Sequence, residues 1–396
     1  MINTYRRIPA DPAEWFEPAE VRKAKDYQRP LNVARAISLA LNAALLLAII
    51  FTHAAPRFAD AFSTSSWILR FFAIVLGFTI VGEIIDLPVT IWTTFSHEKK
   101  WGFSTETPGG FVSDQLKGLV LGVVLQTVLL LPLWWLIRTT DLWWLYGWAV
   151  FFAFTGLLAF LFSVVIAPIF NKFTPLEDES LGTRLRGLAH SQGLRIKAIE
   201  VMDASKRTRK DNAYFAGFGS TKKIVLYDNL LAQSPDVIAS VVGHEIGHWK
   251  RRHIPRTLVV AGVLTFVLFY VLHLVMKWST LFRWAGVSSL RDPAAIPLLL
   301  GVFLILFPLM GFVTSWLSRA HERQADVFAL DVTKDYDAFV ETEHGLSTRN
   351  LIDLAPTWWR YVRLSHPPPA ERLELGKLWK TESAKATAEA KPEPQI

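Results

Sequence analysis

The stretch Val242-Gly243-His244-Glu245-Ile246-Gly247-His248-Trp249 determines how the rest of the chain is interpreted. On a helix, His244 and His248 lie one turn apart on the same face, so both imidazoles can bind one zinc ion. Glu245 lies beside them, where its carboxylate can act as general base on a water molecule activated by the metal. Ser234-Pro235-Asp236 gives this helix an N-cap hydroxyl, a proline at the first helical position and a carboxylate at the positive end of the dipole. The alternative is that two histidines share a helix face by chance, but in a chain with 10 His we favour catalytic zinc.

The composition indicates a polytopic membrane protein. Of the 396 residues, 51% are hydrophobic, including 16 Trp and 27 Phe, and the apolar residues come in long runs. The absence of cysteine excludes disulfides, thiolate zinc ligands and a cysteine nucleophile, so any zinc must be bound by histidine and carboxylate. The formal net charge of +7 is typical of the basic loops of a membrane protein and does not indicate nucleic-acid binding. Residues 1–30 are polar and contain no signal peptide pattern.

Six apolar stretches are each long enough to cross about 30 Å of hydrocarbon as a helix. They are residues 31–53, 67–92, 116–137, 142–167, 254–276 and 294–316. The expected fold is therefore mainly α, a membrane-spanning helical bundle with a small α+β insert. The expected segments are an N-terminal arm (1–30), spans one to four (31–167), an insert with the zinc helix (168–253), spans five and six (254–317), a C-terminal catalytic segment (318–380) and a disordered tail (381–396).

The distribution of basic residues predicts which side of the membrane each loop occupies. Six crossings place both termini and the insert on one side, and the insert is rich in Lys and Arg. The loops on the opposite side contain few basic residues. The positive-inside rule therefore predicts that the termini, the insert and the zinc helix are cytosolic.

The insert is predicted to contain a helix and a small sheet. Residues 181–191 are predicted as a helix, and residues 196–201 and 224–227 as strands. Between the strands, Asn212-Ala213-Tyr214-Phe215-Ala216-Gly217-Phe218-Gly219 could form an edge strand that ends in a glycine-rich turn. Such an edge could pair with an extended peptide through main-chain hydrogen bonds. A hairpin inside the sheet fits the same residues equally well.

A catalytic zinc ion usually has three protein ligands and one open position, so a third ligand is needed. Ser318-Arg319-Ala320-His321-Glu322-Arg323-Gln324-Ala325-Asp326 follows the sixth span, and Glu322 and Asp326 share a helix face. Two spans separate His248 from Glu322, so the chain returns to the side it left. We predict Glu322 as the third ligand and Asp326 as a residue that orients a ligand histidine. The alternatives are solvated charges on a helix leaving the membrane, or His321 as the ligand, although His321 points about 100° away around the helix.

Together, these two segments resemble the M48 metalloprotease family and, more narrowly, the CAAX prenyl protease 1 group. The further matching stretches are Phe170–Leu176, Asn212–Phe215, Ser365–Pro368 and, more loosely, His97–Phe103. The resemblance extends from about residue 16 to residue 379. It implies a zinc endopeptidase with one Zn²⁺ per chain, whose helices surround a chamber that the zinc faces. It also implies ligands His244, His248 and Glu322, general base Glu245, Asp326 next to the ligands, His366 as the group that stabilises the oxyanion, and Asn212, Ala213, Tyr214 and Phe215 as the residues that hold the peptide.

Several further polar residues have more than one interpretation. His366 is also explained as a packing or capping histidine before a Pro-Pro-Pro turn, and Arg372 is expected to pair with Asp326 or with another acid of the site. Glu83 and Asp86 lie within the second span, where they either face a polar chamber or form a structural pair. The basic cluster that ends in His253 is interpreted as an interfacial anchor.

The eukaryotic members of the group have seven spans, whereas this chain shows six and is more similar to a bacterial homologue. We therefore expect a multi-pass protein of a bacterial cell membrane that cleaves membrane-associated or lipidated, CAAX-like proteins. Its expected partners are a peptide or membrane-protein substrate and the lipid bilayer, without nucleic acid; the oligomeric state is not predicted. An HtpX-type quality-control protease is the alternative among enzymes. A transporter or scaffold with a structural zinc is the alternative from another class, but structural zinc normally has four protein ligands.

Overall fold

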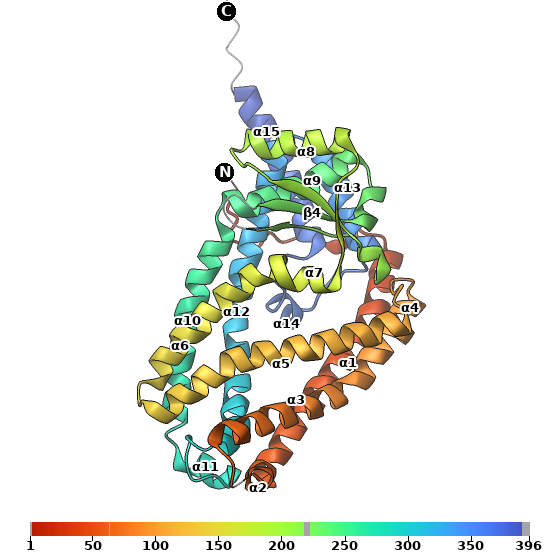
Figure 1. The fold of residues 1–396 in the computed structure, drawn as a ribbon. Coiled ribbons are helices and arrows are strands. Elements are labelled where there is room, and N and C mark those ends of the chain that lie inside the picture. Colours follow the sequence, from red (N-terminus) through yellow and green to blue (C-terminus); the bar gives the residue numbers. More distant parts are fainter. Residues whose placement is uncertain (1, 63, 218–221, 390–396) are drawn as a thin grey trace, which may run out of the picture. The chain divides into compact units, whose positions relative to one another are not determined.

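The computed structural model describes residues 2–62, 64–217 and 222–389, and these are mostly helical (Figure 1). The chain forms two compact units, which we describe separately. The first unit comprises Met1–Arg29, Ser163–Leu258 and Phe312–Ile396. The second unit comprises Pro30–Phe162 and Val259–Gly311.

Long apolar helices make up the second unit. They are α1 (Pro18–Phe51), α3 (Trp67–Ile91), α5 (Pro108–Thr139), α6 (Trp143–Leu161), α10 (His253–Val275) and α12 (Ile296–Thr333), of which α1, α10 and α12 also contribute residues to the first unit. The short elements are α2 (Ala54–Asp60), the π-helical η2 (Trp92–His97), α4 (Glu98–Lys100), α11 (Ser279–Ala285) and the 3₁₀ turn η7 (Pro293–Ala295).

Within the described residues, six helices are long and apolar enough to cross a membrane, and each covers one of the predicted spans to within two residues. Two of these helices extend well beyond the apolar run. Helix α1 begins at Pro18, inside the predicted N-terminal arm, and α12 continues to Thr333, past the predicted end of the sixth span at Trp316. Hydropathy marks the length that lipid can surround, whereas the charged residues beyond it are also good helix formers and continue the helix.

The acids of the second span face a cavity within the second unit. Glu83 and Asp86 both line this cavity, which has a volume of about 450 Å³ and walls from α3, α5, α6, α10 and α12. Asp86 accepts hydrogen bonds from the Ser38 hydroxyl and, at 2.9 Å, from Asn42 Nδ2. The polar partners of Asp86 therefore come from α1, and both acids contribute to the wall of the cavity.

The first unit combines short helices with one small sheet. Its elements are η1 (Pro12–Glu14), the π-helical η3 (Phe162–Ile166), α7 (Ala167–Phe170), β1 (Phe173–Pro175), α8 (Glu179–Ser191), β2 (Ala198–Met202), η4 (Ala204–Lys206), β3 (Ala213–Ala216), β4 (Lys223–Tyr227), η6 (Asp228–Ala232), α9 (Pro235–Lys250), α13 (Tyr336–Arg349), α14 (Trp358–Tyr361) and α15 (Pro369–Glu389).

The sheet has the strand order β1-β2-β4-β3. Strands β2 and β4 are parallel, with Ile199 opposite Ile224, and the other two pairs are antiparallel. The predicted helix and both predicted strands of the insert are present, with ends shifted by one or two residues. Both interpretations of residues 212–219 hold in part, because β3 forms a hairpin with β4 and also lies at the edge of the sheet. The predicted glycine-rich turn falls partly outside the described residues, since residues 218–221 are not included.

The core of the first unit lies between the sheet and helices α8 and α9 (Figure 1). Ile224 and Leu226 of β4 are fully buried against Leu185 of α8. Val242 and Ile246, on the face of α9 opposite to its histidines, are buried in the same cluster. Side chains repeat every two residues along β4 and about every 3.6 residues along α9, so each element has one buried face. Packing of these faces in one cluster holds the zinc helix against the sheet.

The C-terminal tail differs from the prediction. Helix α15 continues through residues 381–389, which were predicted to be disordered. The Ala, Glu and Lys residues that suggested disorder are also strong helix formers, and here they extend a helix that packing has already nucleated. Residues 390–396 lie outside the described part of the chain.

Candidate metal centre and active site

Helix α9 carries the His-Glu-x-x-His residues and begins where the sequence predicts. Ser234 is the N-cap, its hydroxyl accepts a hydrogen bond from Val237 N at 3.3 Å, and Pro235 is the first helical residue. His244 and His248 project from one face with ring centroids 4.8 Å apart. The helix thus presents two imidazoles side by side, as the spacing predicts.

Two glycines of α9 allow it to approach α12 closely. A Cβ atom added to Gly247 would lie 3.0 Å from Ala325 Cα, and one added to Gly243 would lie 3.5 Å from Ala329 Cα. A contact of 3.0 Å is tighter than nine in ten real Cβ contacts, so a side chain at position 247 would require the Ala325 backbone to move by a few tenths of an ångström. Each of these glycines precedes a histidine, so the close contact brings both imidazoles to α12.

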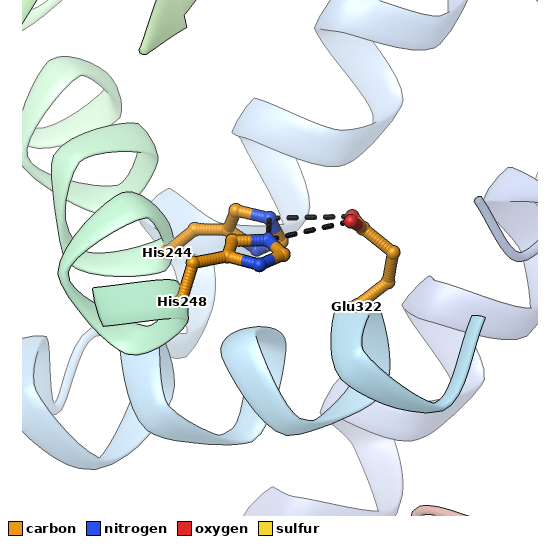
Figure 2. Close-up of side chains that lie close together, drawn as sticks. All are labelled: His244, His248 and Glu322. Atoms are coloured by element: carbon orange, nitrogen blue, oxygen red, sulfur yellow. Dashed lines mark hydrogen bonds and ion pairs between the residues drawn. The ribbon is translucent and has the colours of Figure 1, made fainter. Parts of the chain in front are cut away.

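The close approach places Glu322 of α12 opposite the two histidines (Figure 2). His244 Nε2 and His248 Nε2 are 3.0 Å apart, and each lies 3.3 Å from an oxygen of Glu322. Ligand atoms around a tetrahedral zinc ion with Zn–N bonds of about 2.0–2.1 Å are separated by about 3.3 Å. The three side chains therefore match the spacing of three zinc ligands.

Glu322 also shows an unsatisfied charge that a cation would neutralise. Its side chain is 6% exposed, and Oε2 is buried without a hydrogen-bond partner. A buried carboxylate oxygen without a donor is strongly unfavourable. Because the neighbouring ring nitrogens are typical zinc ligands, the residues present fit a bound zinc ion.

Asp326 lies behind His244 and fixes its orientation. His244 Nδ1 is 2.8 Å from Asp326 Oδ1, so a hydrogen on Nδ1 is donated to the carboxylate and the lone pair of Nε2 faces Glu322. Burial lowers the pKa of His244, but the neighbouring carboxylates of Asp326 and Glu322 outweigh this effect and raise the pKa to about 10. The position therefore favours a positive charge, which either a proton or a divalent cation can supply.

Arg372 of α15 joins Asp326 to a further acid that sequence analysis missed. Its Nε donates to Asp326 Oδ2 at 2.9 Å, which is the predicted pairing, and its Nη1 lies 2.6 Å from Glu343 Oε2. Burial raises the pKa of Glu343 to about 7 although Arg372 opposes the shift. Glu343 lies on α13, outside any motif, so no local pattern indicates its place in the site.

Glu245 is partly buried in the wall of a cleft of about 250 Å³ that His244, Glu322 and His366 also line. Burial raises the pKa of Glu245, while the histidines and a hydrogen bond from the Phe215 backbone partly oppose the shift. A carboxylate with a raised pKa both accepts and releases protons more readily near neutral pH.

The Ser365-His366 segment reaches the same cleft. His366 Nε2 lies 3.4 Å from Glu322 Oε2, and its Nδ1 is 2.9 Å from the Ser365 hydroxyl. The ring is 63% exposed, but the walls of the cleft desolvate it and lower its pKa. His366 therefore lies beside the ligand group, and its exposure argues against a packing role.

The segment from Asn212 to Phe215 reaches the cleft only in part. Asn212 and Ala213 line it, and the Phe215 backbone contacts Glu245. Tyr214 turns away, since its hydroxyl points to Met202 Sδ at 3.9 Å on the other face of the sheet. Side chains alternate along a strand, so Tyr214 can belong to the site only through its backbone.

Two histidines have other places than those predicted. His321 is not in the ligand group found among the described residues; it stacks on His253 with centroids 4.1 Å apart and planes 8° apart. The interpretation of His253 as an interfacial anchor is wrong, because His253 is 3% exposed and contacts His248. The spacing of five residues between His248 and His253 belongs to no regular helix periodicity, so the sequence does not reveal the contact.

The comparisons with known proteins agree with this geometry. Residues 1–172 match the family model for the CAAX prenyl protease N-terminal domain with five membrane helices, and residues 175–377 match the model for peptidase family M48. In the described part of residues 1–172 we find four helices capable of spanning a membrane, one fewer than the family description states.

Relatives match over most of the chain. A CAAX prenyl protease 1 homolog of Oryza sativa is 35% identical over 315 residues, covering 77% of this chain and 73% of that protein. The uncharacterized metalloprotease YhfN of Bacillus subtilis is 28% identical and covers 92% of this chain and 87% of that protein. The crystal structure of S. mikatae Ste24p matches with a TM-score of 0.83 and 26% identity, covering 94% of each chain. The chain therefore belongs to peptidase family M48, a family of zinc enzymes, and is an integral-membrane metalloprotease.

Proposed function

We propose that this protein is a zinc endopeptidase in which His244, His248 and Glu322 bind the metal and Glu245 is the general base. The observation that carries the proposal is the convergence of two imidazole nitrogens, 3.0 Å apart and each 3.3 Å from one oxygen of Glu322, beside a carboxylate in the same cleft. Bound there, zinc would polarise the scissile carbonyl and acidify a water molecule. Structural zinc normally has four protein ligands, whereas this group has three in the described residues, which favours catalysis over the transporter or scaffold alternative.

The chain supplies groups for each proton and charge of peptide hydrolysis. Glu245 takes the proton of the attacking water and delivers it to the leaving amine, and its raised pKa favours both steps. If the Ser365 hydroxyl donates to His366 Nδ1, the hydrogen of the neutral ring is on Nε2. That N–H faces the cleft and can donate to the oxyanion that forms on the carbonyl.

The open edge of β3 is the proposed platform for the substrate backbone. Tyr227 N donates to Asn212 O at 3.0 Å, so Asn212 and every second residue after it bond to β4. The main-chain groups of Ala213 and Phe215 therefore face away from β4, toward the free edge. An extended peptide could pair with them and place its scissile bond beside Glu245, which already contacts the Phe215 backbone.

The proposed substrates are membrane-associated or lipidated proteins of CAAX-like type, since several relatives carry the name CAAX prenyl protease 1 homolog. The proposed location is a bacterial cell membrane, with the termini and the catalytic cleft on the cytosolic side. The excess of Lys and Arg in the insert supports this orientation. The competing function is general cleavage of membrane proteins for quality control, and cleavage of two peptides distinguishes it from the proposed one.

The test compares Glu245→Gln with Glu322→Ala in the purified full-length protein. We expect Glu245→Gln to retain one zinc ion per chain but to lose peptide cleavage by about 10²–10⁴-fold, because only the base is removed. We expect Glu322→Ala to lose zinc as well as activity. Zinc is measured by elemental analysis and cleavage by mass spectrometry of a prenylated CAAX peptide and its unprenylated counterpart.

The matched control is Glu341→Gln, an exposed glutamate of α13, which should retain both zinc and activity. Undiminished cleavage by Glu245→Gln would remove Glu245 as the base. Equal cleavage of both peptides would favour the quality-control function over a lipid-dependent one.

A further inference from the structure

His248 contacts a second histidine on the side that faces away from Glu322. His253 Nδ1 lies 3.0 Å from His248 Nδ1, and His253 Nε2 lies 3.2 Å from Gln324 Oε1. His253 is the first residue of α10, and Gln324 belongs to α12, two residues after Glu322. His253 and Gln324 are 3% and 9% exposed, so this is a buried row of polar groups that leads from the candidate ligand into the protein.

The hydrogens along this row have only one consistent arrangement. If His248 Nε2 offers its lone pair to a metal, its hydrogen is on Nδ1 and is donated to His253 Nδ1. The neutral His253 then has its hydrogen on Nε2, from which it donates to Gln324 Oε1. Each donor meets an acceptor, so the three residues form a directed chain that keeps His248 in the tautomer required of a ligand.

The position of His253 is held from several directions. The His321 ring stacks on it at 4.1 Å, and His321 Nδ1 lies 3.4 Å from the Thr257 hydroxyl. Arg252, in the turn between α9 and α10, has a φ of 56°, which a residue with a side chain rarely adopts. This turn ends α9 and starts α10 at His253, whose ring lies against His248.

The two histidines of the ligand group thus have different supports. His244 donates to a carboxylate, Asp326, whereas His248 donates to a neutral imidazole. A carboxylate makes a ligand histidine more basic, and a neutral acceptor orients it without adding charge. Because Glu322 already brings one negative charge, a neutral partner limits the charge around the metal.

We propose that His253, oriented by Gln324, is a positioning residue that holds His248 in the tautomer and direction needed to bind zinc. The inference rests on the proposed function, since it presumes that His248 is a zinc ligand. His253 touches neither the substrate nor the metal and acts through His248 alone.

The test compares two replacements that separate the acceptor from the ring. His253→Phe keeps a planar ring for stacking on His321 but removes the acceptor. His253→Asn loses the ring but can place an amide oxygen near the position of Nδ1. We expect His253→Phe to weaken zinc binding by about 10–100-fold, and His253→Asn to restore most of the affinity. Zinc affinity is measured by competition with a chromophoric chelator in the purified full-length protein.

A second readout is the visible absorption of the cobalt-substituted protein, which reports the geometry of the ligands. His253→Phe should shift these bands, whereas His253→Asn should leave them close to those of the unchanged protein. The matched control is His190→Phe, on the exposed end of α8, which should alter neither readout. Unchanged zinc affinity in His253→Phe, or equal losses in both His253 variants, would overturn the positioning role.

Three further variants keep the outcome decisive. His248→Ala tests the proposed function itself: if it leaves zinc affinity unchanged, the ligand assignment fails and the inference fails with it. If His248→Ala loses zinc but His253→Phe does not, the inference fails alone. If His253→Phe does not fold, position 324 provides the test. Gln324→Leu removes the oxygen that accepts the hydrogen of His253 Nε2, and Gln324→Glu keeps an oxygen there. Only loss of zinc affinity in Gln324→Leu with retention in Gln324→Glu then supports the proposal.

Discussion

At the scale of single residues, the site depends on side chains that are not among the proposed metal ligands. Asp326 is fully buried, orients His244 through Nδ1 and is itself held by Arg372. Arg372 in turn is shared with Glu343. Without the guanidinium between them, the two carboxylates would repel each other, so loss of Arg372 would destabilise this arrangement.

Replacement of Asp326 by Asn should weaken zinc binding by about 10–100-fold. The amide keeps the shape but removes the negative charge that supports His244 and pairs with Arg372. Chelator competition on the purified protein measures the affinity. Asp337→Asn is the control, because the Asp337 side chain is 90% exposed on α13. If both variants bind zinc equally well, Asp326 does not orient the ligand.

At the scale of elements, one close approach of two helices and one free strand edge create the site. Helix α9 reaches α12 because Gly247 has no side chain at the contact. Strand β3 leaves Ala213 and Phe215 at a free edge, with no further strand paired to it among the described residues. The helix pair therefore assembles the metal ligands, and the strand edge presents main-chain hydrogen-bonding groups next to Glu245.

If the substrate pairs with this edge, methylation of its backbone nitrogens should affect KM at every second residue. Main-chain groups along a bound strand alternate between facing β3 and facing away. A methyl group on a nitrogen that faces β3 should raise KM by about 2–10-fold, the loss of roughly 0.5–1.5 kcal/mol for one hydrogen bond. Methyl groups at the intervening positions serve as controls in the same kinetic series. Equal effects at neighbouring positions would contradict pairing with the edge.

At the scale of the whole molecule, six helices in the described residues are long and apolar enough to cross a membrane. If all six cross, the two ends of the chain and the insert with α8, the sheet and α9 lie on one side of the bilayer. The excess of basic residues in the insert supports our proposal that this side is the cytosol.

The chain has no cysteine, so single-cysteine variants report sidedness without background. We expect a membrane-impermeant maleimide to label Ser288→Cys and Thr64→Cys in intact cells. Thr183→Cys, on the exposed side of α8, should react only after the cells are permeabilised. All three positions are exposed, so reactivity depends on the side of the membrane. The reverse labelling pattern would overturn the proposed orientation.

Glu322 was predicted as third ligand from the return of the chain across two spans and from the family resemblance, whereas the spans and the zinc helix with His244 and His248 on one face were determined by the sequence itself. These features follow from hydropathy and from spacings of three to four residues, which act within one element and need no knowledge of its neighbours. Only the tertiary structure decided that His253 supports His248, that Glu343 shares Arg372, and that the Tyr214 side chain faces away from the cleft. Such contacts join segments that are distant in the chain or separated by a turn. They depend on how helices and strands pack against one another, and no periodic pattern in the sequence reports that packing.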